Sequence, residues 1–128
     1  MLTQEQVAQF HRDGYLRGGP VLSDEQVEVL RDELKRVIDD GDKSGVPQPV
    51  LLHNMNGDPN NAVWQIVNIW EASNPFRELL IANQTIAQEM SQLTGASALR
   101  IWHDQIQYKP PKVGGTNMWH QDAPLWPI

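Results

Sequence analysis

The sequence predicts a mixed α/β protein, because helical and strand-like hydrophobic periodicities occupy different parts of the chain. Several segments carry apolar residues at helical spacing behind polar capping residues. Two other segments are rich in β-branched and aromatic residues and partly alternate. At 128 residues the chain has the size of one domain with one hydrophobic core.

Start and stop signals predict the helices. Thr3 with Gln6 and Ser23 with Gln26 each form a capping box, in which a hydroxyl and a side chain three residues later satisfy backbone N–H groups. Proline is acceptable in the first turn of the third helix, and Gly95 stops the fourth. The predicted helices span about 4–11, 24–40, 74 onward and 84–93.

The segment 42–61 between the second helix and the first strand is rich in Gly, Pro, Asn and Asp. We expect it to be irregular, as either a lid or a simple connection. His53 in this segment is expected to be solvated rather than a ligand. The residues 63–70 that follow are predicted to form a strand.

A longer strand is predicted over 98–108. One face would carry Leu99, Ile101, His103, Gln105 and Gln107, and it changes from apolar to polar. Such a change fits a strand that runs from a core into a cavity, although a half-exposed edge strand has the same pattern. After a loop over 109–115, an antiparallel segment would bring the next residues towards this polar face.

His120 and Asp122 are the candidate metal ligands. Side chains two residues apart on an extended backbone point the same way, so the imidazole and the carboxylate can coordinate one ion. They would supply two ligands of the 2-His-1-carboxylate triad of non-haem iron oxygenases. The motif is weak by itself, because His11 and Asp13 have the same spacing at the end of a predicted helix. A hydrogen-bonded pair without an ion is an alternative.

Composition limits the classes of function. The formal charge of −6, the absence of a Lys/Arg run and the lack of a long apolar segment argue against nucleic-acid and membrane partners. The polar N-terminus differs from a secretory signal, so a cytoplasmic location is expected. With no cysteine, any metal must be held by histidine and carboxylate side chains.

Together these segments resemble the phytanoyl-CoA dioxygenase family of Fe(II)- and 2-oxoglutarate-dependent oxygenases, which includes ectoine hydroxylase-like enzymes. The resemblance spans nearly the whole chain, and the order of its pieces is more specific than any one of them. It rests on 2–7, 13–16, 22–27, 100–105, 108–111, 119–122 and 125–127.

The resemblance implies a fold and a set of roles. The fold would be a double-stranded β-helix, or jelly roll, with the N-terminal helices packed on its outside and its C-terminal strands absent from this chain. His120 and Asp122 match the first two iron ligands. Gln107 and His103 match positions that help hold 2-oxoglutarate, and Trp126 matches an aromatic residue that lines the same pocket.

The implied function is hydroxylation of a small-molecule substrate by molecular oxygen, with release of succinate and carbon dioxide. The family's distal histidine ligand and its 2-oxoglutarate-binding arginine would fall after Ile128. Residues 1–128 are therefore expected to be the N-terminal portion of one oxygenase domain, with a helical region over about 1–95 and the first core strands and metal motif over about 97–128. The alternatives are a non-catalytic binding or scaffold domain of the same fold and a cupin-like metalloenzyme.

Overall fold

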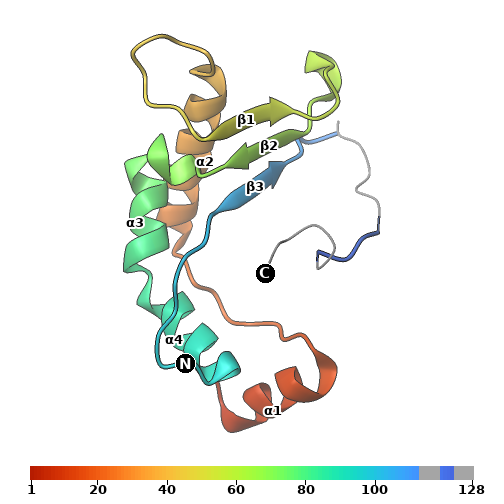
Figure 1. The fold of residues 1–128 in the computed structure, drawn as a ribbon, viewed down its shortest axis with the longest axis vertical. Coiled ribbons are helices and arrows are strands. Elements are labelled where there is room, and N and C mark those ends of the chain that lie inside the picture. Colours follow the sequence, from red (N-terminus) through yellow and green to blue (C-terminus); the bar gives the residue numbers. More distant parts are fainter. Residues whose placement is uncertain (113–118, 123–128) are drawn as a thin grey trace.

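A computed structural model describes residues 1–112 and 119–122. The described part is mixed α/β, as predicted, with four α-helices and one three-stranded sheet (Figure 1). No described helix is long and apolar enough to cross a membrane. The elements are α1 (Gln4–Asp13), α2 (Asp24–Asp39), β1 (Leu51–Asn54), the 3-10 helix η1 (Pro59–Asn61), β2 (Trp64–Val67), the 3-10 helix η2 (Ile69–Glu71), α3 (Asn74–Ala82), α4 (Gln84–Thr94) and β3 (Gln105–Tyr108).

Both predicted capping boxes form. The Thr3 hydroxyl accepts a hydrogen bond from the Gln6 backbone N–H, and the Gln6 side chain accepts one from the Thr3 N–H at 2.8 Å. The Ser23 and Gln26 pair repeats this arrangement at the start of α2. Because these contacts are local, the sequence is sufficient to locate both helix starts.

The three strands form an antiparallel sheet in the order β1-β2-β3. Its register sets side chains in rows across the sheet. Leu52, Ile66 and Ile106 form one row on the face that meets the core. His53, Gln65 and Gln107 form a row on the opposite face. A second row there contains Leu51, Val67 and Gln105.

The core lies between the sheet and the helices α2 and α3. Ile66 on β2 and Ile69 on η2 are fully buried, and Val37 on α2 is 2% exposed. Partly buried residues from each strand, α2 and α3 surround them, including Phe76. Figure 1 shows α2 crossing behind the sheet, so one face of the sheet is covered by helix and the other is left open in the described part.

The prediction that 42–61 is irregular was wrong in part, because β1 lies within it. Proline and glycine around 51–54 obscure a short alternation in which Leu52 faces the core. Pairing with β2 supplies the stabilisation that local propensity lacks. Asn54 fixes the connection that follows, because its side-chain oxygen accepts hydrogen bonds from the N–H groups of Asn56 and Val63.

Both predicted strands are shorter than expected. β2 ends at Val67 because Asn68 adopts a left-handed conformation, with φ of 55°, and starts η2. The segment 98–104 is not a strand, and Leu99 and Ile101 are 46% and 53% exposed instead of contributing to the core. The core residue of this region is Ile106, on the face opposite to the predicted one.

Contacts of Asp104 explain why β2 ends at Val67 and β3 begins only at Gln105. Its carboxylate accepts a hydrogen bond from the Ile69 N–H at 3.0 Å, and its backbone N–H and C=O bond to the Asn68 side chain and N–H. These contacts replace ladder hydrogen bonds at the junction. Burial raises the pKa of Asp104, while the backbone N–H groups of Ile69, Trp70 and Asn68 act in the opposite direction.

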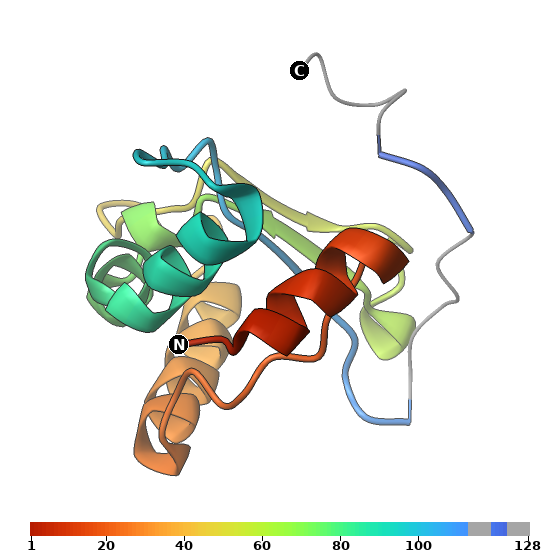
Figure 2. The same cartoon turned by 90° about the horizontal axis from the view of Figure 1, so that it is seen from below.

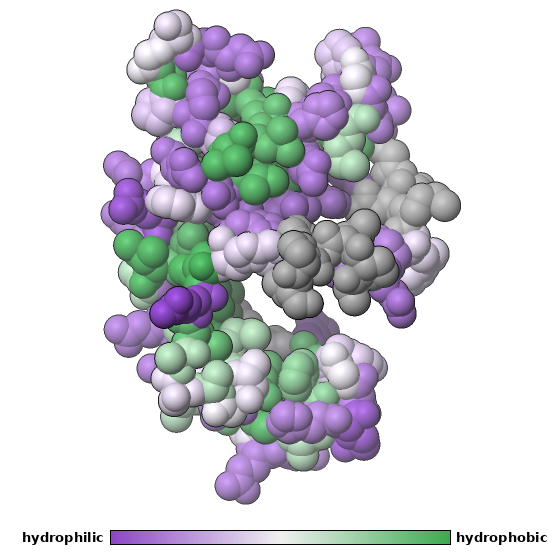
Figure 3. Space-filling view, in the orientation of Figure 1, coloured by the Kyte–Doolittle hydropathy of each residue, from purple (hydrophilic) through white to green (hydrophobic). Residues whose placement is uncertain are grey.

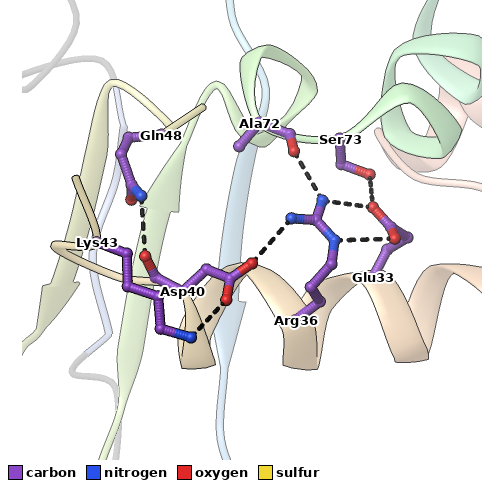
Figure 4. Close-up of polar contacts among 7 residues, drawn as sticks. All are labelled: Glu33, Arg36, Asp40, Lys43, Gln48, Ala72 and Ser73. Carbon is purple, nitrogen blue, oxygen red and sulfur yellow. Dashed lines mark hydrogen bonds and ion pairs between the residues drawn. The ribbon is translucent and has the colours of Figure 1, made fainter. Parts of the chain in front are cut away.

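A network of ion pairs and hydrogen bonds connects α2 to the residues at the start of α3 (Figure 4). The Arg36 guanidinium donates to Glu33 at 2.7 and 3.0 Å, to Asp40 at 3.3 Å and to the Ala72 carbonyl at 2.8 Å. The Ser73 hydroxyl donates to Glu33 at 2.6 Å. The hydrogen bond from Arg36 lowers the pKa of Glu33 below its ordinary value, so the fold favours the charged carboxylate.

This network predicts a pH-dependent contribution to stability. A carboxylate whose folded-state pKa is lowered stabilises the fold at neutral pH and loses that contribution as the pH falls through the lowered pKa. We expect Glu33→Gln to reduce the free energy of unfolding by about 1–2 kcal/mol at neutral pH and by less in acid. Urea denaturation followed by circular dichroism at both pH values measures the difference.

Glu28→Gln is the matched control. Glu28 also pairs with an arginine three residues later, Arg31, at 2.7 Å, but both side chains are exposed. An exposed pair contributes little, so this variant should lie within about 0.5 kcal/mol of the parent. Equal losses for both variants would contradict the role assigned to Glu33.

Candidate metal and cofactor site

His120 and Asp122 converge in the structure. The imidazole Nε2 lies 3.4 Å from the carboxylate Oδ1, and the side chains are 54% and 68% exposed. The backbone over 119–122 is not in a strand, so the antiparallel pairing expected for this segment does not include these four residues. The two side chains nevertheless point towards one another, and their separation fits two ligands of one ion as well as a hydrogen-bonded pair without an ion.

The nitrogen and oxygen donors of this pair suit a divalent transition metal such as iron. Among residues 1–112 and 119–122, no group of three or more His, Cys, Asp or Glu side chains could hold a metal ion. The described residues therefore supply two candidate ligands of a facial triad. A third ligand would have to lie outside them.

Gln107 lies in β3, and His103 lies just before this strand. Gln107 is exposed on the open face of the sheet, opposite Gln65 on β2. His103 is half-buried, with its Nδ1 3.1 Å from the Asp104 carbonyl and its ring edge-on to Trp102 at 4.6 Å between centroids. Because a carbonyl oxygen only accepts, Nδ1 is the protonated nitrogen in this contact. Trp126, the third predicted cofactor contact, lies outside the described residues.

The candidate ligands and the open sheet face lie on the same side of the structure. Figure 2 shows residues 119–122, drawn in blue between grey segments, on the side of the sheet away from α2. Gln107 belongs to that face as well. A ligand between the sheet and His120 would therefore contact the face that the helices leave uncovered.

The open face combines polar and apolar side chains. Figure 3, which views the molecule from this side, shows hydrophobic and hydrophilic residues next to one another. Leu51 is 40% exposed and belongs to the same face as His53, which is also exposed. A surface that combines apolar side chains with a few polar groups is typical of small-molecule binding sites and less typical of a packed protein core.

His53, Gln65 and Gln107 form one row across the sheet, which the sequence did not indicate. His53 is exposed, as expected, but it lies on a strand instead of an irregular loop. The alternation of Leu51, Leu52 and His53 before a turn was the available signal. Only the strand register places His53 and Gln107 in one row.

The grooves between the helices contain none of the predicted site residues. One, of about 360 Å³, lies between α2 and α3, and another, of about 190 Å³, lies between α1 and α4. Both are open and lined mainly by helix side chains. The sheet face and residues 119–122 therefore remain the candidate site.

Comparison with known proteins identifies the family of this chain. The family model for phytanoyl-CoA dioxygenase (PhyH) matches residues 10–128, which is most of the chain. The chain therefore belongs to the phytanoyl-CoA dioxygenase family, whose members are dioxygenases that generally depend on Fe(II) and 2-oxoglutarate. No curated protein and no solved structure matches it.

Proposed function

We propose that this protein is an Fe(II)- and 2-oxoglutarate-dependent oxygenase that hydroxylates a small-molecule substrate and releases succinate and carbon dioxide. The observation that carries the proposal is the 3.4 Å approach of His120 Nε2 to Asp122 Oδ1 in a chain of this family. These two groups are the histidine and carboxylate that begin a facial triad.

His120 would bind the metal through Nε2, and Asp122 would bind it through a charged carboxylate oxygen. The bound metal and 2-oxoglutarate together would supply the oxygen-activating chemistry, while the protein orients the substrate and limits the access of water. The third histidine ligand and the arginine for the distal carboxylate would come from residues beyond the described ones. The sheet would then be part of a jelly roll, with residues 1–128 as the N-terminal portion of one cytoplasmic oxygenase domain.

Gln107, His103 and Trp126 would shape the 2-oxoglutarate site. The Gln107 carboxamide is exposed on the open sheet face, where its NH₂ group can donate to a carboxylate oxygen. His103 would form one side of the site, and Trp126 would line it with an aromatic ring.

A substitution at Gln107 tests the role of this residue. We expect Gln107→Ala to raise the KM for 2-oxoglutarate about tenfold, because one hydrogen bond to a charged group is lost, and to leave the KM for the primary substrate unchanged. Gln107→Glu should raise it further, since a carboxylate would then face a carboxylate. Steady-state kinetics with varied 2-oxoglutarate measures both effects. A change confined to the primary substrate would move Gln107 to the substrate side.

A non-catalytic binding or scaffold domain of the same fold is the second candidate. It is favoured by the finding that residues 1–112 and 119–122 contain two candidate ligands and no larger cluster. Iron titration of the full-length protein, with succinate measured after addition of 2-oxoglutarate, separates the two. Tight iron binding with succinate release supports the oxygenase, whereas neither iron uptake nor succinate would favour the scaffold.

A further inference from the structure

One row of side chains crosses the open sheet face from strand to strand. It contains His53 on β1, Gln65 on β2 and Gln107 on β3, and the register pairs each with the next. Neighbouring strands are about 4.8 Å apart, so His53 and Gln107 are separated by about 10 Å. This distance exceeds the length of the five-carbon 2-oxoglutarate chain. One molecule of 2-oxoglutarate beside Gln107 would therefore leave His53 available to another ligand.

The side chains of His53 and Gln65 make no hydrogen bond to any residue within 1–112 and 119–122. Gln65 is half-buried and His53 is exposed. By contrast, Asn54 next to His53 points to the other face and hydrogen-bonds its own loop. His53 and Gln65 therefore present donors and acceptors that the described part of the fold does not use.

The adjacent row on the same face is largely apolar. Leu51 and Val67 pair across β1 and β2, and Gln105 follows on β3. Neither row contains Asp, Glu, Lys or Arg. Away from the metal, which would offset the charge of 2-oxoglutarate, a ligand with a phosphate or another strongly charged group would find no opposite charge in these rows. An uncharged hydrogen-bonding group next to an apolar chain would be complemented there.

We propose that His53 is a specificity-determining residue that hydrogen-bonds an uncharged polar group, such as an amide or a hydroxyl, of the primary substrate. The apolar part of the substrate would lie on Leu51 and Val67. This inference rests on the proposed oxygenase function, because Gln107 and residues 119–122 define the reaction side of the sheet. It adds a substrate class to that function.

The histidines of the full-length protein can report on this site by nuclear magnetic resonance. The protein is labelled with ¹³C-histidine, and His53→Gln identifies the His53 ring signal. Mn(II) is added as a paramagnetic replacement for iron, with 2-oxoglutarate present. We expect strong broadening of His120 and clear broadening of His53.

The substrate class is then probed with hexanamide, which joins a short apolar chain to an uncharged amide. In protein loaded with Zn(II) and 2-oxoglutarate, hexanamide should shift the His53 signal and leave His11 unchanged, and hexanoate should shift it less. His53→Ala should weaken hexanamide binding about fivefold and change the affinity for 2-oxoglutarate less than twofold.

The outcomes separate this inference from the proposed function. If Mn(II) leaves His120 unbroadened, the oxygenase proposal fails, and the role of His53 fails with it. If His120 broadens but His53 responds neither to Mn(II) nor to hexanamide, only the role of His53 is overturned. A response to hexanoate as large as that to hexanamide would overturn the substrate class.

Discussion

Replacing either His120 or Asp122 by alanine is expected to abolish iron-dependent succinate release by the full-length protein. Each change removes one of the two converging donor groups, which lie 3.4 Å apart. Because changes to residues that merely support a ligand already reduce metal affinity or activity by about 10–100-fold, loss of a ligand itself should exceed about 100-fold. Equilibrium dialysis with Fe(II) and an assay of succinate measure the two consequences separately.

The chain contains its own control for this experiment. His11 and Asp13 have the same spacing as His120 and Asp122, but they lie on α1, where residues two apart do not face each other. The Asp13 carboxylate instead pairs with Arg12 at 2.9 Å. We expect His11→Ala and Asp13→Ala to retain parental iron binding. Normal turnover after loss of His120 or Asp122 would refute the ligand assignment.

The contrast between these two pairs shows what sequence could predict. A spacing of two residues has different meanings on a helix and on an extended backbone, and the capping box at Thr3 identified the first pair as helical. Local signals of this kind also located the starts of α1 and α2. The family expected from the ordered set of motifs is the one whose model matches residues 10–128.

Features that depend on distant contacts were not predictable. β1 is stable because it pairs with β2, and the long strand expected over 98–108 is reduced to four residues because Asp104 bonds to the start of η2. Alternation of residue types gives the two faces of a strand but not which one meets the core. For this reason the sequence assigned Ile101 to the core, whereas the structure buries Ile106 in part and exposes Ile101.

The second large effect is expected on β2, where adjacent residues belong to opposite faces. Ile66 is 0% exposed and contacts the core cluster with Val37 and Ile69, so Ile66→Ala should reduce the free energy of unfolding by about 2–5 kcal/mol. Val67 is half-buried on the open face, and Val67→Ala should reduce it by less than about 1 kcal/mol. Urea denaturation of the full-length protein, followed by circular dichroism, measures both.

The difference between these two variants also bears on function. If the open face lines a ligand cavity, Val67 contacts substrate instead of a packed core, so Val67→Ala should weaken hexanamide binding while it leaves stability nearly unchanged. Ile66→Ala should lower the stability and leave hexanamide binding nearly unchanged at temperatures where the protein remains folded. A loss of stability at Val67 as large as that at Ile66 would mean that both faces of β2 are tightly packed. The His53 row could not then form the floor of a cavity, because a fully packed face leaves no room for a substrate.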